Sequence, residues 1–180
     1  FPDTYTFSSD LTVEKVIETM LDQTDKKFSE YKSLIDSSSY SINELVTLAS
    51  IVESEGIYDD DRKKIAGVFY NRLKAGMSLG SDVTTYYAFK VDLGDRDLTK
   101  AEINTYNPYN TRGPEMSGKL PIGAVSNFGI SSLEAVLKPT NSDNYYFVAD
   151  KSGKTHFTKT YEEHQKVIKE LKEAGNWIEW

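Results

Sequence analysis

The chain has 180 residues, of which 38% are hydrophobic and 27% charged, so it is long enough to bury a core within one domain. The net charge of −7 and the lack of any basic cluster argue against nucleic acid as a partner. With no Cys and two His, the chain offers no disulfide framework, no thiolate nucleophile and no His-rich metal site. No apolar run in the sequence is long enough to span a membrane.

The first part of the chain predicts an extended start followed by helix. Residues 1–10 form a short aromatic stretch typical of extended backbone. From residue 12 to about 37, apolar residues recur at helical spacing, interrupted by a charged middle. Because the chain begins at Phe1 rather than Met, we expect a piece of a longer protein whose signal or anchor lies upstream.

The next predicted helix contains Glu53 within an apolar run. Ser41 and Glu44 form a capping-box signature at its start, and Gly56 stands just past its end. A step of 100° per residue places Glu53 beside apolar positions such as Ala49, so its carboxyl group should leave from a largely buried surface. Removal from water favours the protonated carboxyl group that a general acid needs, and a structural ion pair is the alternative.

A second carboxylate follows two residues later, at Glu55. It lies about 200° further round a regular helix, so the two carboxylates cannot meet on one substrate atom. The acids at 59–61 then open another helix that stops near Gly76, because acidic residues suit the positive end of a helix. Arg72 on that helix is a candidate structural partner for Glu55.

The remainder predicts an α+β fold that is rich in helix. Residues 77–130 are irregular, with one short helix begun by a Thr99–Glu102 capping box, and their aromatic content argues against disorder. A short helix at 131–137, a hairpin over 145–157 and a final helix at 160–174 follow. We expect one domain over 1–180 with a small antiparallel hairpin, and a lysozyme-like arrangement around the Glu53 helix stays open.

Several motifs occur in an order that resembles the endolytic murein transglycosylases, the MltG or YceG-like family, from residue 1 to about 164. They are Leu48-Ala49-Ser50-Ile51-Val52-Glu53-x-Glu55, Val68-Phe69-x-Asn71-Arg72-Leu73, Met77-x-Leu79-x-Ser81-Asp82, Pro108-Tyr109-Asn110-Thr111, Ser131-x-Leu133-Glu134-Ala135, Tyr146-Phe147-Val148-Ala149-Asp150, and His156 with Thr158 leading to Glu163-His164.

The resemblance implies an enzyme that cuts peptidoglycan glycan strands internally. The bond is the β-1,4 link between N-acetylmuramic acid and N-acetylglucosamine, and the product carries a 1,6-anhydromuramyl end. The resemblance also implies an upstream membrane anchor, a place on the extracytoplasmic face of a bacterial cell membrane, and an association with the peptidoglycan synthesis machinery as a terminator of nascent strands. No cofactor or metal is implied, and the family's catalytic glutamate maps onto Glu53.

The mechanism we expect needs one carboxyl group. Protonated Glu53 donates to the glycosidic oxygen and then takes the proton of the muramyl C6 hydroxyl as that oxygen attacks C1. Candidates for binding the substrate or stabilising the charge that develops are Ser81, Asp82, Tyr87, Tyr109, Asn110, Thr111 and His156. Two of them have structural alternatives: Asp82 as a helix cap and His156 as a cross-strand packing residue.

The chain departs from the family pattern at Gly80, where Gln is usual, and at Val83, where Pro is common. Two other functions stay open, and the loss of an amide at Gly80 leaves room for the first of them. One is a non-catalytic module that binds peptidoglycan or acts as a scaffold. The other is a hydrolase of the same bond, which would place a water-activating carboxylate such as Asp82 opposite Glu53.

Overall fold

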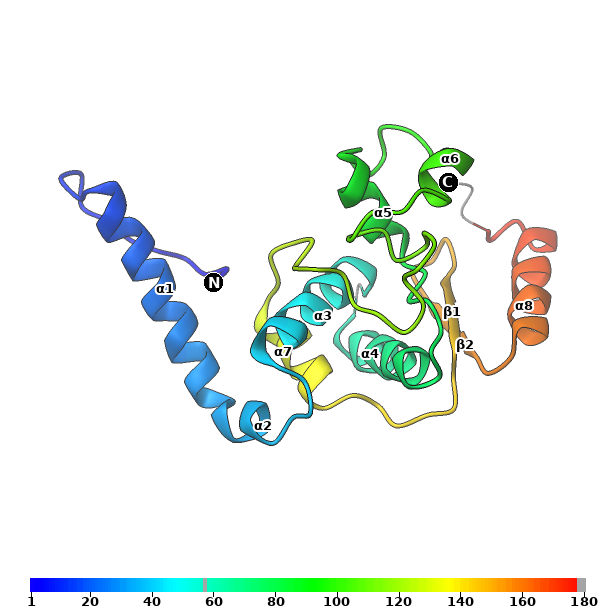
Figure 1. Ribbon diagram of the computed structural model, residues 1–180, viewed down its shortest axis with the longest axis horizontal. Coiled ribbons are helices and arrows are strands. Elements are labelled where there is room, and N and C mark those ends of the chain that lie inside the picture. Colours follow the sequence, from blue (N-terminus) through cyan, green and yellow to red (C-terminus); the bar gives the residue numbers. More distant parts are fainter. Residues whose placement is uncertain (57, 178–180) are drawn as a thin grey trace.

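A computed structural model describes residues 1–56 and 58–177 and confirms an α+β fold rich in helix (Figure 1). Over these residues the elements are α1 (Val13–Glu30), α2 (Lys32–Asp36), α3 (Ile42–Glu55), α4 (Asp59–Lys74), α5 (Asp82–Phe89), α6 (Lys100–Ile103), α7 (Ile130–Leu137), β1 (Tyr146–Ala149), β2 (Thr155–Thr158) and α8 (Tyr161–Glu173). None of the described helices is both long enough and apolar enough to cross a membrane.

The core lies where α3, α4 and α7 pack together (Figure 1). Seven of the eight residues from Leu45 to Val52 are buried, all but Val46, which explains why this helix reads as the most apolar part of the chain. The predicted capping box starts it, since Ser41 Oγ accepts from the Glu44 amide at 3.3 Å and the Glu44 carboxylate accepts from the Ser41 amide at 2.7 Å.

One glycine of α4 allows the chain to cross that helix closely. A Cβ at Gly67 would lie 2.3 Å from the Thr140 carbonyl oxygen, and the Thr140 amide donates to the Lys63 carbonyl at 2.9 Å. Only a residue without a side chain fits this approach. The crossing carries the chain from α7 to the hairpin, which packs on α4 through Phe69 and Phe147 at 5.8 Å between ring centroids.

The predicted hairpin and final helix are both present. Strands β1 and β2 pair antiparallel with Tyr146 opposite Thr158 and Ala149 opposite Thr155. Helix α8 begins at a capping box formed by Thr160 and Glu163 and packs against both strands. This layer covers the side of α4 that faces away from α3 (Figure 1).

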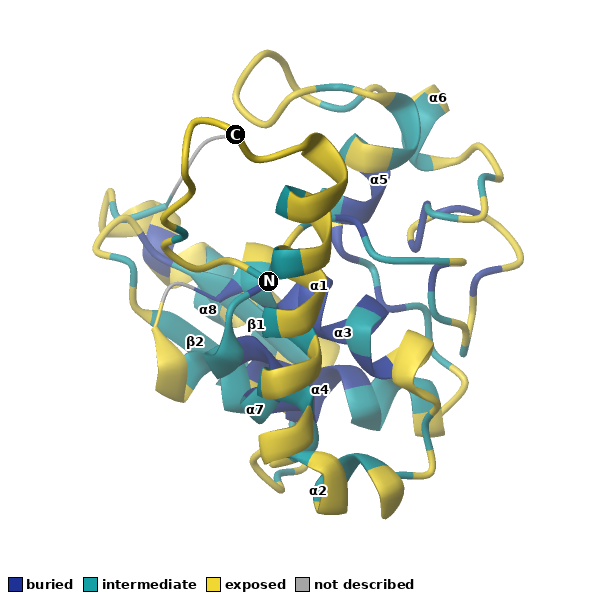
Figure 2. Ribbon diagram, turned by 90° about the vertical axis from the view of Figure 1, so that its left-hand side faces the viewer, coloured by how far each residue is buried: buried dark blue, intermediate teal, exposed yellow. Residues whose placement is uncertain are grey.

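The predicted N-terminal helix is broken at Tyr31 into α1 and α2. Helix α1 has no buried residue, as its yellow and teal ribbon in Figure 2 shows, and it stands apart from the three-helix core in Figure 1. The extended residues before it run back along the helix, and the Phe1 ring meets the Phe128 ring edge-on at 6.5 Å.

The structure contains a helix that the sequence did not predict, α5 (Asp82–Phe89). Its residues lack helical apolar spacing, and its stability comes from partners elsewhere in the chain. Thr84 Oγ1 accepts from the Thr111 amide at 3.1 Å, and Thr85 Oγ1 donates to Asn110 Oδ1 at 2.7 Å, with both threonines fully buried. These bonds fix α5 beside the C-terminal end of α3.

Candidate functional site

Glu53 links α3 to the start of α7. Its Oε2 accepts from the Gly129 amide at 2.9 Å and from Ser132 Oγ at 2.7 Å, and its Oε1 accepts from Arg62 Nη2 at 3.3 Å. The side chain is 29% exposed, so it is half-buried rather than sealed in the core. Gly129 is the N-cap of α7, and an anion at a helix N-terminus is favoured by the orphan amides and the helix dipole.

Arg62 adds further bonds to this joint. Its Nη1 donates to Asp59 Oδ1 at 2.7 Å and to Ser131 Oγ at 2.8 Å. The Glu53 carboxylate therefore has three donors directed at it, one of them a guanidinium group. This arrangement suits a structural carboxylate that holds α3, α4 and α7 together.

Glu55 has different surroundings, on the side of α3 that faces α5. Its Oε1 accepts from Ser81 Oγ at 2.6 Å, and among the described residues Oε2 has no hydrogen-bond partner. Burial is the main cause that raises the pKa of Glu55 above its ordinary value, and the Asp82 carboxylate adds to the rise. Arg72, predicted as its partner, bonds instead to the Tyr145 and Leu79 carbonyl oxygens.

The predicted site residues Ser81, Asn110 and Thr111 lie together in one buried network. The Ser81 amide donates to Thr111 Oγ1 at 3.0 Å, and Thr84 Oγ1 lies 2.7 Å from the same oxygen. Asn110 Nδ2 donates to the Glu102 and Thr105 carbonyl oxygens at 3.0 and 2.8 Å. Asn110 and Thr111 have no exposed surface, so they hold the Ser81 turn in place beside Glu55 instead of facing a ligand.

Asp82 follows Ser81 in the first turn of α5 and makes no capping bond. Its Oδ1 accepts from Arg112 Nη1 at 2.6 Å, and its side chain is 57% exposed. The cap predicted as its structural alternative is therefore absent, and the carboxylate forms an exposed ion pair near Glu55.

A pocket of about 650 Å³ opens next to α5. Tyr87 and Tyr109 form one wall, with ring centroids 4.8 Å apart and planes tilted by 59°, and Tyr87 is 45% exposed. Ser54 and Ser126 line it from the α3 side, their hydroxyl oxygens 3.2 Å apart. Ser54 stands between Glu53 and Glu55, although neither carboxylate lines the pocket itself.

His156 lies in the hairpin, away from this pocket. Its Nε2 is 2.8 Å from Asp150 Oδ2, and Asp150 Oδ1 accepts from the amides of Ser152 and Lys154. The side-chain bond to His156 is the largest cause that lowers the pKa of Asp150. The pair locks the turn between β1 and β2, in line with the packing alternative for His156.

No direct chemical role for Glu55 was predicted from the sequence, although its position in the Glu53-x-Glu55 motif was the available signal. The rotation of 200° between the two carboxylates is confirmed by their separate partners, since Glu53 meets α7 and Glu55 meets Ser81 before α5. Which of the two faces suits a proton donor depends on those partners.

Comparison with known proteins places this chain in a family. A model of the YceG-like family matches residues 1–170. The chain is 42% identical over 168 residues to a Bacillus subtilis (strain 168) protein named endolytic murein transglycosylase, and 40% identical over 176 residues to one of that name from Streptococcus pneumoniae strain D39. These matches cover 93% and 94% of this chain but only 45% and 31% of the relatives, so the chain spans less than half of their length.

A crystal structure of a putative YceG-like protein from Listeria monocytogenes has the same fold. The TM-score is 0.83 at 40% sequence identity, and the match covers 93% of this chain and 53% of that one.

Proposed function

Because the chain belongs to the YceG-like family, we propose that it is the catalytic part of an endolytic murein transglycosylase. The bond cut is the β-1,4 link between N-acetylmuramic acid and N-acetylglucosamine inside a glycan strand, and the new end is a 1,6-anhydromuramyl residue. The observation that carries the proposal is a half-buried carboxyl group, Glu55, held by Ser81 beside an aromatic pocket.

The contacts favour Glu55 over Glu53 as the proton donor. Glu53 already accepts from three donors, one of them a guanidinium group, so its carboxylate is committed to the joint between α3, α4 and α7. Glu55 accepts one hydroxyl bond and keeps one oxygen free among the described residues, and desolvation is the main cause that raises its pKa. The assignment to Glu53 stays a prediction that rests on the family motif, and one experiment separates the two.

A single carboxyl group can perform both proton transfers. Protonated Glu55 gives its proton to the glycosidic oxygen as the bond from that oxygen to C1 breaks. The C6 hydroxyl oxygen of the same muramyl ring forms the new bond to C1, and the Glu55 carboxylate takes the hydroxyl proton. Atoms and charge balance without water, so the product is lighter by one water than a hydrolysis product.

The surrounding residues position the acid and the sugar. Ser81 fixes one Glu55 oxygen, and the Asn110–Thr111 network fixes Ser81. The Tyr87 and Tyr109 rings offer apolar faces on which a sugar ring can stack. The Asp82 carboxylate, partly neutralised by Arg112, places negative charge near the positive centre that develops at C1.

The test is product analysis by mass spectrometry after incubation with purified glycan strands. We expect anhydromuramyl ends from the wild type and from Glu53→Gln where that variant remains folded, and none from Glu55→Gln. The reverse pattern would assign the donor to Glu53. Reducing ends would identify a hydrolase, and strand binding without new ends from the wild type would identify a non-catalytic module.

The cellular setting is part of the same proposal. Intact glycan strands exist outside the cytoplasmic membrane, so we place this domain on the extracytoplasmic face, held by a segment upstream of it. An enzyme that cuts nascent strands internally must meet them during synthesis, which predicts an association with the synthesis machinery. Co-purification of the full-length protein with a polymerising enzyme tests that association.

A further inference from the structure

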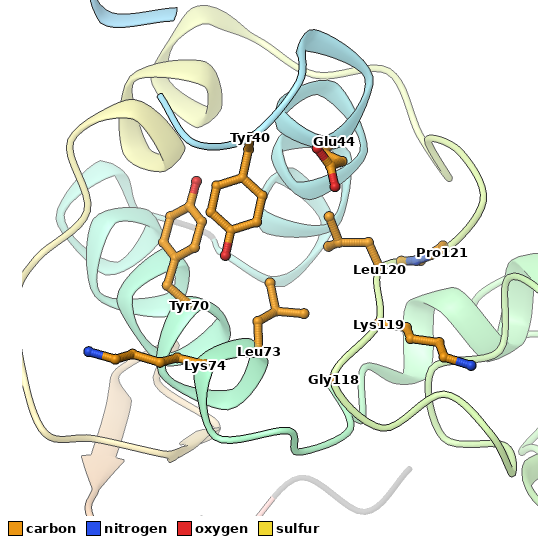
Figure 3. Close-up of a pocket in the computed structure, with 9 residues that line it drawn as sticks. All are labelled: Tyr40, Glu44, Tyr70, Leu73, Lys74, Gly118, Lys119, Leu120 and Pro121. Atoms are coloured by element: carbon orange, nitrogen blue, oxygen red, sulfur yellow. The ribbon is translucent and has the colours of Figure 1, made fainter. Parts of the chain in front are cut away.

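A second pocket, of about 800 Å³, lies at the opposite end of α3 from Glu55 (Figure 3). Tyr40 and Tyr70 form its aromatic side, with ring centroids 5.1 Å apart. Leu120 lies in the loop that leads to the pocket lined by Tyr87 and Tyr109, and it provides the apolar surface opposite Tyr40 and Tyr70. A volume of this size falls within the range of about 300–1,000 Å³ that is usual for ligand sites.

The walls of this pocket are held in place by contacts that fill no other evident role. Tyr70 Oη donates to the Val136 carbonyl at 2.8 Å, which fixes the ring against α7. The loop is tied to the turn after α4, because the Gly118 amide donates to the Met77 carbonyl at 2.9 Å. Gly118 has φ +69°, and a Cβ there would lie 3.1 Å from the Gly76 Cα, so the close approach requires glycine.

Charged groups of both signs surround the pocket. Lys74 and Lys119 lie at the two ends of one edge of the pocket, with their ammonium groups pointing away from each other, and Glu44 lies at the opposite edge (Figure 3). Within the described part of the chain neither ammonium group has a carboxylate partner, although the chain carries a net charge of −7. Glu44 binds Ser41 through Oε2 at 2.7 Å and leaves Oε1 without a partner among the same residues.

We propose that this pocket binds the peptide stem carried by the glycan strand, a short peptide that contains carboxylates, alanine methyl groups and a free amine. The carboxylates match Lys74 and Lys119, the amine matches Glu44, and the methyl groups match the two tyrosine rings. The proposal rests on the proposed function, since it names the part of the same substrate that a second site would hold.

The distance between the two sites suits one substrate. Glu44 and Glu55 are eleven residues apart on α3, which is roughly 16 Å along the helix axis. An extended peptide of five residues reaches about 17 Å. The loop also connects the sites directly, because Leu120 lines this pocket, Val125 and Ser126 line the other, and the Ile122 amide between them donates to the Pro108 carbonyl at 3.1 Å.

The first experiment measures binding of a synthetic stem peptide, L-Ala-γ-D-Glu-L-Lys-D-Ala-D-Ala, to the full chain by calorimetry or NMR titration. The variant Lys74→Gln/Lys119→Gln should weaken binding about tenfold, since two charge-assisted contacts are lost. The matched control is Lys166→Gln/Lys169→Gln, which makes the same charge change on exposed α8 side chains and should bind like the wild type. A peptide whose carboxylates are amidated should lose the same affinity.

The second experiment compares cleavage of strands with and without peptide stems. The pocket variant should lower the ratio of kcat/KM for peptide-bearing strands to that for bare strands about fivefold or more, mainly through KM. Equal peptide affinity in the variant and the control would overturn the proposal, as would an equal loss for bare strands, which would assign the pocket to sugar. Absence of cleavage by the wild type would refute the proposed function, while the peptide titration would still decide whether this pocket binds the stem.

Discussion

The joint between α3 and α7 makes a stability prediction for Glu53→Gln. The amide keeps one oxygen, so it can accept from the Gly129 amide or Ser132, but it turns an N–H group towards Arg62. Hydrogen bonds to a charged group contribute about 1.5–3 kcal/mol and neutral ones about 0.5–1.5 kcal/mol. The favourable placement at the α7 N-terminus adds roughly 0.5 kcal/mol. With partial exposure taken into account, we expect a loss of about 2–3 kcal/mol in the free energy of unfolding.

Urea unfolding followed by circular dichroism measures this loss. With a slope of about 2 kcal/mol per molar for a domain of this kind, the midpoint should fall by roughly 1–1.5 M. The matched control is Glu162→Gln, which removes an exposed acid from the first turn of α8 and should change stability by about 0.5 kcal/mol or less. A Glu53→Gln variant as stable as that control would refute the claim that Glu53 stabilises the joint between α3 and α7. A stable Glu53→Gln variant that has lost all cleavage would return the catalytic role to Glu53.

Three other changes test separate parts of the structure. Burial raises the pKa of Glu55, so the stability linked to its proton is complete below its ordinary pKa of 4.5 and is lost as pH rises through the pKa of the folded state. Glu55→Gln should therefore reduce the fall in the urea midpoint between pH 4.5 and neutrality. An unchanged dependence of the midpoint on pH would contradict this. Gly67→Ala places a methyl group against the Thr140 carbonyl and should cost about 2 kcal/mol by thermal unfolding, whereas an unchanged midpoint would show that the crossing can shift. Tyr109→Leu should raise KM for glycan strands about fivefold with little change in kcat, and a fall in kcat alone would exclude stacking as its role.

The helix starts and the hairpin could be predicted from sequence because local contacts decide them. The capping boxes at Ser41, Thr99 and Thr160 each join residues three apart, and all three are present. The hairpin depends on a short turn between two alternating strands, which is also a local pattern.

Helix α5 shows where local patterns fail. Thr84 and Thr85 have low helix propensity and no apolar spacing, so nothing within the segment marks it as helical. The partners that satisfy their hydroxyl groups, Asn110 and Thr111, are more than twenty residues away. A sequence shows which residues can bond but leaves open which distant partner each one meets.

By itself, the sequence determined the α+β class, the capped helix with its two carboxylates, and the turn of about 200° that separates them, because helix geometry depends only on position along the chain. The tertiary structure alone decided their environments. Glu53 meets an arginine and a helix N-terminus, whereas Glu55 lies against Ser81, where desolvation raises its pKa and so favours the protonated form. A carboxyl group's chemistry depends on the solvent and donors around it, and those come from segments far apart in the chain.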